Sequence, residues 1–184
     1  MTTVYEMSSD VDRYGALFLE DDAHAALISA NLLSNDLSRV WPSPYVVAGT
    51  ESDPRIRSPG DFPYTRTGLL MLSSRAAEVL RDMLTDHGGF LPLRCPNGSV
   101  VAYQATTVLP ALDEEKSELE RAEATGRIIG VDRYVLIPGV VDRVPIFRIR
   151  GIERWHCMRH AVVVHISSGT GLRTRAGRSA GLVQ

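Results

Sequence analysis

The sequence lacks the features that mark membrane, secreted or cysteine-stapled proteins. Its longest apolar runs are far shorter than the roughly 18 residues that a membrane-spanning helix needs. Its first residues show no basic leader followed by an apolar core, so no secretory signal is expected. Its two cysteines, Cys95 and Cys157, are too few for a disulfide framework. These absences predict a cytoplasmic protein with no membrane contact.

Lysine is almost absent, because Lys116 is the single lysine among twenty basic residues. The net charge of −2 hides an uneven distribution. Residues 1–62 hold ten acidic and four basic residues, residues 63–126 nine and six, and residues 127–184 three and ten. The basic last third has no interleaved aromatic residues and no nucleic-acid-binding module, so no nucleic-acid partner is expected. The acidic remainder indicates either a face for a basic partner or charges that the fold neutralises internally.

The length of 184 residues suits one domain with a core of its own. Five prolines between residues 40 and 64 predict a loop-rich segment. A short helix over residues 23–33 is expected to precede it. We therefore expect a loop-rich N-terminal lobe over residues 1–64, an α+β core over residues 65–175 and a disordered tail over residues 176–184.

A helix is the clearest predicted element of the core. Apolar residues recur at helical spacing between residues 74 and 87. Ser73 or Ser74 can cap its first turn, and we expect Gly88 and Gly89 to end it with a left-handed residue.

Strands are predicted after this helix. Two alternating runs separated by Pro96-Asn97-Gly98 predict a β-hairpin. The expected fold class is α+β: an antiparallel sheet with the hairpin over residues 90–109 and strands over residues 128–137 and 145–150, packed with the helix over residues 74–87. In the last strand, alternation places Phe147 in the core. Arg148 and Arg150 share the other face and are expected to reach solvent or a carboxylate.

Seven short segments follow one another between Gly60 and Arg175. They are Gly60-Asp61-Phe62, Leu72-Ser73-Ser74, the hairpin LPLRCPNGSVVAYQATTVLPALD, Asp113 with Lys116-Ser117, Val135-Leu136, Pro145-Ile146-Phe147-Arg148 and Gly169-Thr170-Gly171-Leu172. No single segment is specific. In this order they resemble immunity protein family eleven of bacterial polymorphic toxin systems, a group formerly classed as a domain of unknown function.

This resemblance implies a cytoplasmic protein, encoded beside a toxin, that protects its producer by binding that toxin. It brings no catalytic residues and no cofactor. It implies positions that mainly build the fold, namely Asp61, Asp113, Ser117, Phe147, Arg148 and Gly171. The family pattern also places a short helix over residues 161–166, where β-branched residues favour a strand; we follow the family pattern.

One cluster invites a catalytic or metal-binding interpretation. His156 and His160 would share one face of a helix, as paired zinc ligands do, and Cys95 could add a third ligand. No acidic residue lies between the histidines, and no oxyanion-hole signature accompanies a nucleophilic Cys157. We therefore expect structural roles here and predict no metal site, no cofactor and no catalytic residue.

The stretch from Asp113 to Arg127 carries a run of acidic residues. Its simplest interpretation is a solvated acidic loop or short helix. Paired carboxylates for acid–base chemistry are an alternative, and a surface for a basic partner is a third. An aromatic side chain could anchor such a contact. The candidate partner-binding residues are Asp113, Glu114, Glu115, Glu118, Glu120 and Trp41.

These observations favour a non-enzymatic immunity protein that binds and neutralises a cognate toxin stoichiometrically. An alternative is an enzyme, such as a hydrolase, that reverses or antagonises the toxin's action through the region of His156 and His160. Another is a regulatory binding module with a different partner. The identity of the toxin and the oligomeric state stay open.

Overall fold

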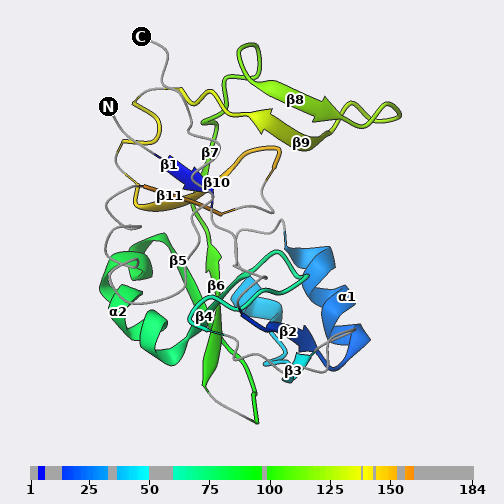
Figure 1. Ribbon diagram of the computed structural model, residues 1–184, viewed down its shortest axis with the longest axis vertical. Coiled ribbons are helices and arrows are strands. Elements are labelled where there is room, and N and C mark those ends of the chain that lie inside the picture. Colours follow the sequence, from blue (N-terminus) through cyan, green and yellow to red (C-terminus); the bar gives the residue numbers. More distant parts are fainter. Residues whose placement is uncertain are drawn as a thin grey trace.

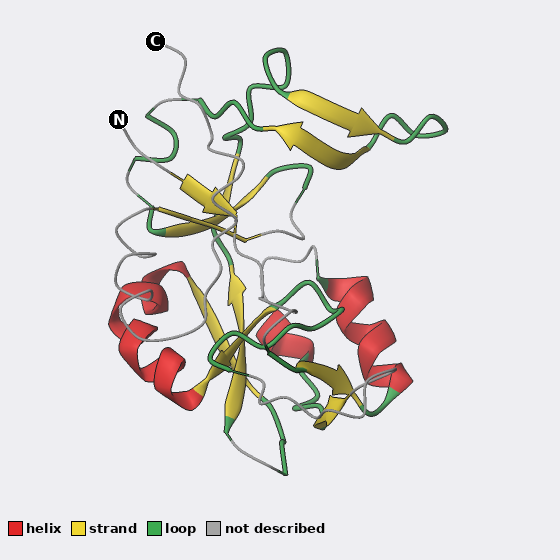
Figure 2. Ribbon diagram, viewed as in Figure 1, coloured by secondary structure: helices red, strands yellow, loops and turns green. Residues whose placement is uncertain are grey.

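The computed structural model describes residues 4–6, 14–32, 37–49, 60–96, 99–137, 139–142, 144–152 and 156–159. In this part of the chain both α-helices lie in the first half and the second half holds only strands, so the predicted α+β class is confirmed (Figures 1 and 2). With η for 3-10 helices, the elements are β1 (Val4–Glu6), β2 (Ala16–Leu19), α1 (Asp22–Asn31), η1 (Leu37–Val40), β3 (Val46–Gly49), β4 (Leu70–Ser73), α2 (Ser74–Leu84), η2 (Thr85–His87), β5 (Gly88–Pro92), β6 (Val100–Ala105), β7 (Val108–Leu109), β8 (Glu118–Arg121), β9 (Ile128–Arg133), β10 (Ile146–Ile149) and β11 (His156–Arg159).

A three-stranded antiparallel sheet in the order β4–β6–β5 lies between the two α-helices; we call it the central sheet (Figure 1). Strand alternation divides the side chains of β6 between two clusters. Tyr103 and Ala105 pack with α2, whereas Ala102 packs with α1. Both faces of the sheet are therefore covered. Neither α-helix in the described part of the chain has the length and apolar character needed to span a membrane.

Strands β2 and β3 form a second, two-stranded antiparallel sheet. Parallel bridges from Ala16 to Tyr64 and from Tyr45 to Arg94 join it to the segments before β4 and after β5. Leu17 and Val46 pack there against Val100 of the central sheet. The elements between residues 14 and 49 thus pack on the central sheet, and the domain limits at residues 64 and 175 stay predictions.

The second strand of the predicted hairpin is divided. β5 and β6 pair as expected. The pairing ends just after β6, where Thr106 N donates to O of His87, the residue before β5, at 2.9 Å. Thr107 O then accepts from Arg148 N, and β7 pairs parallel with β10. The result is a separate four-stranded sheet in the order β1–β11–β10–β7. The expected single antiparallel sheet is therefore several sheets, because the chain changes partners at these two threonines.

The start of α2 is confirmed and its end differs from expectation. Ser73 is the N-cap, and its Oγ accepts from Ala76 N at 3.1 Å. The helix runs into η2, and Gly88 then has φ 178°, so the prediction of a left-handed stop there is wrong. Glycine is needed for a different reason. A Cβ at this position would lie 2.2 Å from Gln104 O on the paired strand.

Alternation along β10 is as predicted, but the environment of Arg148 is not. Phe147 is fully buried in the core, as expected, and Arg150 is exposed. Arg148 was expected to reach solvent or a carboxylate, yet it is only 1% exposed. Its Nη1 donates to Leu32 O, at the C-terminal end of α1, at 2.8 Å. The face expected to be open is covered because α1 and the central sheet pack against it.

Ionisation of Tyr103 should make the fold sensitive to alkali. Burial raises the pKa of its hydroxyl, which donates to Leu84 O at 3.0 Å, well above the ordinary value. Above about pH 10 the unfolded chain loses this proton while the folded chain keeps it, so the free energy of unfolding falls as pH rises.

We expect Tyr103→Phe to remove that part of the pH dependence, while costing about 1 kcal/mol at pH 7 through the lost hydrogen bond. Urea unfolding at pH 7 and pH 10.5 measures both effects. The exposed Tyr64, changed to Phe, is the control and should keep the wild-type dependence. Equal alkaline losses in Tyr103→Phe and wild type would contradict the expectation.

Candidate functional site

Residues 113–133 form a two-stranded ribbon that projects from the rest of the molecule; we call it the acidic arm (Figure 1). β8 and β9 pair antiparallel within it, and the ladder begins at a bridge between Leu112 and Leu136. The acidic stretch was expected to be a solvated loop or short helix. Strand β8 contradicts this expectation at residues 118–121, whereas the turns on either side of the strand agree with a loop. The strand was not predicted because only one of its residues is apolar. That residue, Leu119, lies between two glutamates and pairs with Val131 across the ribbon.

The root of the acidic arm is fixed by Ser117. Residues 113–117 form a turn that interrupts the pairing between the two strands of the arm. Ser117 N closes this turn by donating to Asp113 O at 2.9 Å. The Ser117 hydroxyl then occupies the gap opposite Val135. It accepts from Val135 N at 3.0 Å and lies 3.3 Å from Val135 O. This serine therefore builds the junction between the arm and the four-stranded sheet.

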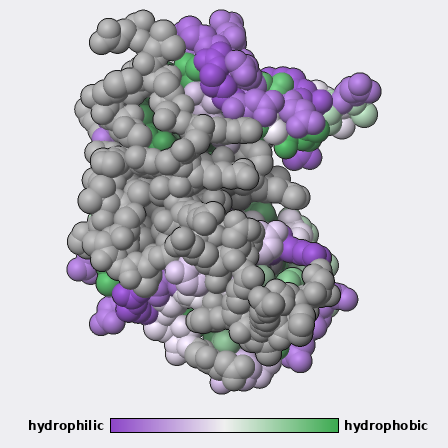
Figure 3. Space-filling view, in the orientation of Figure 1, coloured by the Kyte–Doolittle hydropathy of each residue, from purple (hydrophilic) through white to green (hydrophobic). Residues whose placement is uncertain are grey.

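One face of the acidic arm packs on the body and the other is open. Val131 is buried, and Leu119 and Ile128 pack against the same cluster as Phe147 and Ile149 of β10. This contact anchors the ribbon along one side. The opposite side carries charged residues, and Figure 3 shows hydrophilic surface over the arm with a few apolar atoms among it.

Three of the predicted partner-binding carboxylates form ion pairs within the acidic arm. Asp113 pairs with Lys116 at 2.8 Å, Glu114 with Arg121 at 2.5 Å and Glu118 with Arg133 at 2.8 Å. The hydrogen bond from Lys116 holds the pKa of Asp113 below its ordinary value, and Asp113 raises the pKa of Lys116 in turn. All three pairs are substantially exposed, so each contributes little to stability.

Three other carboxylates of the arm are open to solvent or to a partner. Glu115, Glu120 and Glu123 are exposed, and none of them forms an ion pair within the described residues. Counted together, residues 113–133 hold seven acidic and four basic side chains, a net charge of −3. The acidic arm is therefore a negatively charged projection.

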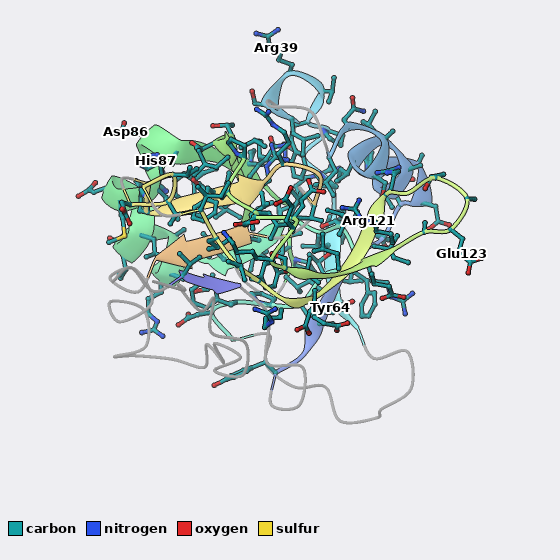
Figure 4. The ribbon with its side chains drawn as sticks, turned by 90° about the horizontal axis from the view of Figure 1, so that it is seen from above. Arg39, Tyr64, Asp86, His87, Arg121 and Glu123 are labelled. Atoms are coloured by element: carbon teal, nitrogen blue, oxygen red, sulfur yellow. The ribbon has the colours of Figure 1, made fainter. Side chains whose placement is uncertain are left out.

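The tip of the acidic arm is held by its own main chain. Ala122 N donates to Arg127 O at 2.9 Å, and Gly126 N donates to Ala122 O at 2.8 Å. Arg121 adds a bond from Nη1 to Gly126 O at 2.9 Å. Gly126 has φ +66°, which glycine adopts without strain. Glu123 points outward from this ordered turn (Figure 4).

Trp41, the remaining candidate, is not part of the acidic arm. Its indole Nε1 donates to Pro92 O at 2.7 Å, and its ring packs against the cluster under α1. The structure thus brings the five predicted carboxylates together and leaves Trp41 beside the central sheet. The candidate residues did not include Glu123, Ile129 or the arm's basic residues. Glu123 lies in the same acidic run as the candidates, whereas Ile129 and Arg133 join this surface only through the pairing of β9 with β8.

The family-pattern residues occupy structural positions where they are described. Asp61 is 9% exposed and accepts from Ser73 Oγ at 2.5 Å, while Arg75 pairs with its other oxygen. Ser117 fixes the root of the acidic arm, and Phe147 and Arg148 are buried on β10. Gly171 and the segment over residues 161–166 lie outside the described residues, as does the predicted tail.

The helical zinc-pair arrangement that was weighed for the histidine–cysteine cluster does not form where the cluster is described. His156–Arg159 is strand β11, paired with β1 on one side and β10 on the other. The strand contradicts the helical spacing on which paired zinc ligands depend, and His160 lies outside the described residues. Within the described ranges, no three His, Cys, Asp or Glu side chains are grouped to hold a metal ion.

Two open hollows lie near the ends of β5 and β6 and beside α1. One, of about 480 Å³, is lined in part by Tyr45, Arg94 and Cys95. The other, of about 490 Å³, lies between α1 and β2, where the Arg66 guanidinium is 5.9 Å from the centre of the Phe18 ring. Neither hollow includes a residue of the acidic arm.

No family model matches the chain, and no curated protein matches it. The resemblance to immunity protein family eleven therefore stays a prediction based on the residues named above.

Proposed function

We propose that this chain is a cytoplasmic immunity protein, which binds a toxin encoded beside it and neutralises that toxin stoichiometrically. The observation that carries the proposal is the acidic arm, a projecting ribbon of net charge −3 whose tip is ordered without help from the core. The resemblance to immunity protein family eleven supports the same function.

The charge of the acidic arm supports fast recognition of a basic partner. Many toxins that act on nucleic acids or anionic substrates present a basic active-site surface, and carboxylates imitate the substrate's negative charge. Attraction between opposite surfaces raises association rates by about 10- to 1,000-fold at low salt. Glu115, Glu120 and Glu123 can contribute because they are exposed and do not pair with the arm's own basic residues.

The order of the tip supports tight binding. A loop that is already in its bound conformation loses less conformational entropy on association. The main-chain bonds at Ala122 and Gly126 supply that order. Binding of the arm over the toxin's active site would then block its substrate without any covalent chemistry.

The product of the neighbouring gene tests this function. We expect co-expression of this chain to rescue cells from that product, and the two purified proteins to form a one-to-one complex. The triple variant Glu115→Gln, Glu120→Gln, Glu123→Gln should associate about tenfold more slowly at low salt and show a weaker salt dependence.

A matched control removes the same charge elsewhere. Glu78, Asp82 and Asp86 are exposed on or just after α2. Their amide variants, made together, should leave the association rate near that of the wild type. Failure of the wild-type chain to bind at micromolar concentration, or to rescue the cells, would overturn the proposal.

A further inference from the structure

Ile129 is the most exposed large hydrophobic side chain in the described part of the chain, at 54%. It lies on β9 where the register of the acidic arm shifts. Glu120 pairs with Gly130 and Arg121 with Ile128, so Ile129 has no residue opposite it. Such bulges turn a side chain out of the regular alternation. The bulge explains why this isoleucine is exposed although its neighbours Ile128 and Val131 pack inward.

One carboxylate lies at Gly130, the residue that follows Ile129. Glu120 crosses the ribbon toward Gly130, where an added Cβ would lie 2.7 Å from Glu120 Oε2. Glycine therefore leaves room for the carboxylate next to Ile129. Glu123 extends from the tip that follows β8 (Figure 4). The acidic arm thus presents an exposed apolar side chain on a ribbon whose charged residues sum to −3.

We propose that Ile129 is the apolar anchor of the acidic arm and inserts into a hollow on a basic surface of the partner toxin. This inference rests on the proposed function. A central apolar residue surrounded by polar groups is the arrangement that concentrates binding energy in protein interfaces. Glu120 and Glu123 would face basic side chains at the rim of that hollow.

Charge decides which occupant fits. A second copy that met this one arm to arm would bring another net charge of −3 against the first, and like charges facing each other oppose association. A basic protein surface gains attraction from the same carboxylates. The partner is therefore a basic protein with an apolar recess, and self-association is the outcome that the test must exclude.

Substitutions at two nearly equally exposed apolar residues test whether Ile129 anchors the contact. Val79, at 52% exposed on α2, matches Ile129 in exposure and lies outside the arm. With the neighbouring gene's product as the probe, we expect Ile129→Ala to weaken binding by about 10-fold and Ile129→Asp by about 30-fold or more. Val79→Asp should bind like the wild type.

The readouts distinguish this inference from the proposed function. Circular dichroism and thermal unfolding of each variant show whether the fold is intact, and Ile129→Ala keeps the test valid should the aspartate disturb the arm. Binding by the wild type with equal binding by both Ile129 variants overturns the anchor and leaves the proposed function standing. Absence of wild-type binding overturns both. Dimers of this chain that Ile129→Asp dissociates would also overturn the inference.

Discussion

Gly88→Ala is expected to lower the free energy of unfolding by about 3 kcal/mol, because overpacking at this position cannot be relieved cheaply. The new methyl group would meet Gln104 O at 2.2 Å and the Tyr103 hydroxyl at 2.3 Å. The first atom belongs to the paired strand, and the second is tied to Leu84 O. Relief therefore requires β5 to move away from β6.

Gly89→Ala is the matched control, since it changes the next residue of the same strand. Nothing lies within 4 Å of a Cβ at Gly89. We expect its free energy of unfolding to stay within about 0.5 kcal/mol of the wild type. Urea unfolding followed by circular dichroism measures both variants. Similar losses in the two alanine variants would show that β5 does not approach β6 as described.

Arg148→Ala is expected to lower the free energy of unfolding by about 4 kcal/mol, as a large cavity opens and a buried carbonyl loses the shorter of its two hydrogen bonds. The arginine reaches from β10 to Leu32 O, which Gln104 Nε2 also approaches at 3.5 Å. Gln104 Oε1 in turn accepts from Leu37 N at 2.8 Å. The side chain thus connects the four-stranded sheet, α1 and the central sheet.

Arg150→Ala provides the comparison, because it removes an exposed arginine from the residue that follows β10. Its effect should lie within about 0.5 kcal/mol. Arg148→Met, which restores much of the lost volume without a donor, should fall between the two alanine variants. Urea midpoints at neutral pH measure all three. An Arg148→Ala variant as stable as Arg150→Ala would contradict the buried position of Arg148.

Local signals predicted the helix and the hairpin well. Apolar spacing and the cap at Ser73 are contained within one element, and β5 and β6 lie close in sequence and pair with each other. The sequence could not show that β7 pairs with β10, since that contact joins residues about forty positions apart. Long-range pairing depends on packing that no short window contains.

The acidic arm shows the same limit at the level of the site. Its carboxylates were identified as candidates from charge alone, and the structure places them on one ribbon. Which carboxylates are neutralised depends on the folded ribbon, where Arg121 pairs with Glu114 across a turn and Arg133 pairs with Glu118 across the two strands. Arg148 was misassigned because alternation gives the face of a strand but not what covers that face.

The main-chain closure of the arm's tip also bears on how such a protein diversifies. The turn from Ala122 to Arg127 is specified by Gly126 and backbone bonds, so Glu123 and Ala124 can be exchanged without altering the scaffold. Under the proposed function, variants that keep Gly126 and the buried face of the ribbon could change their recognition through substitutions at these two positions alone.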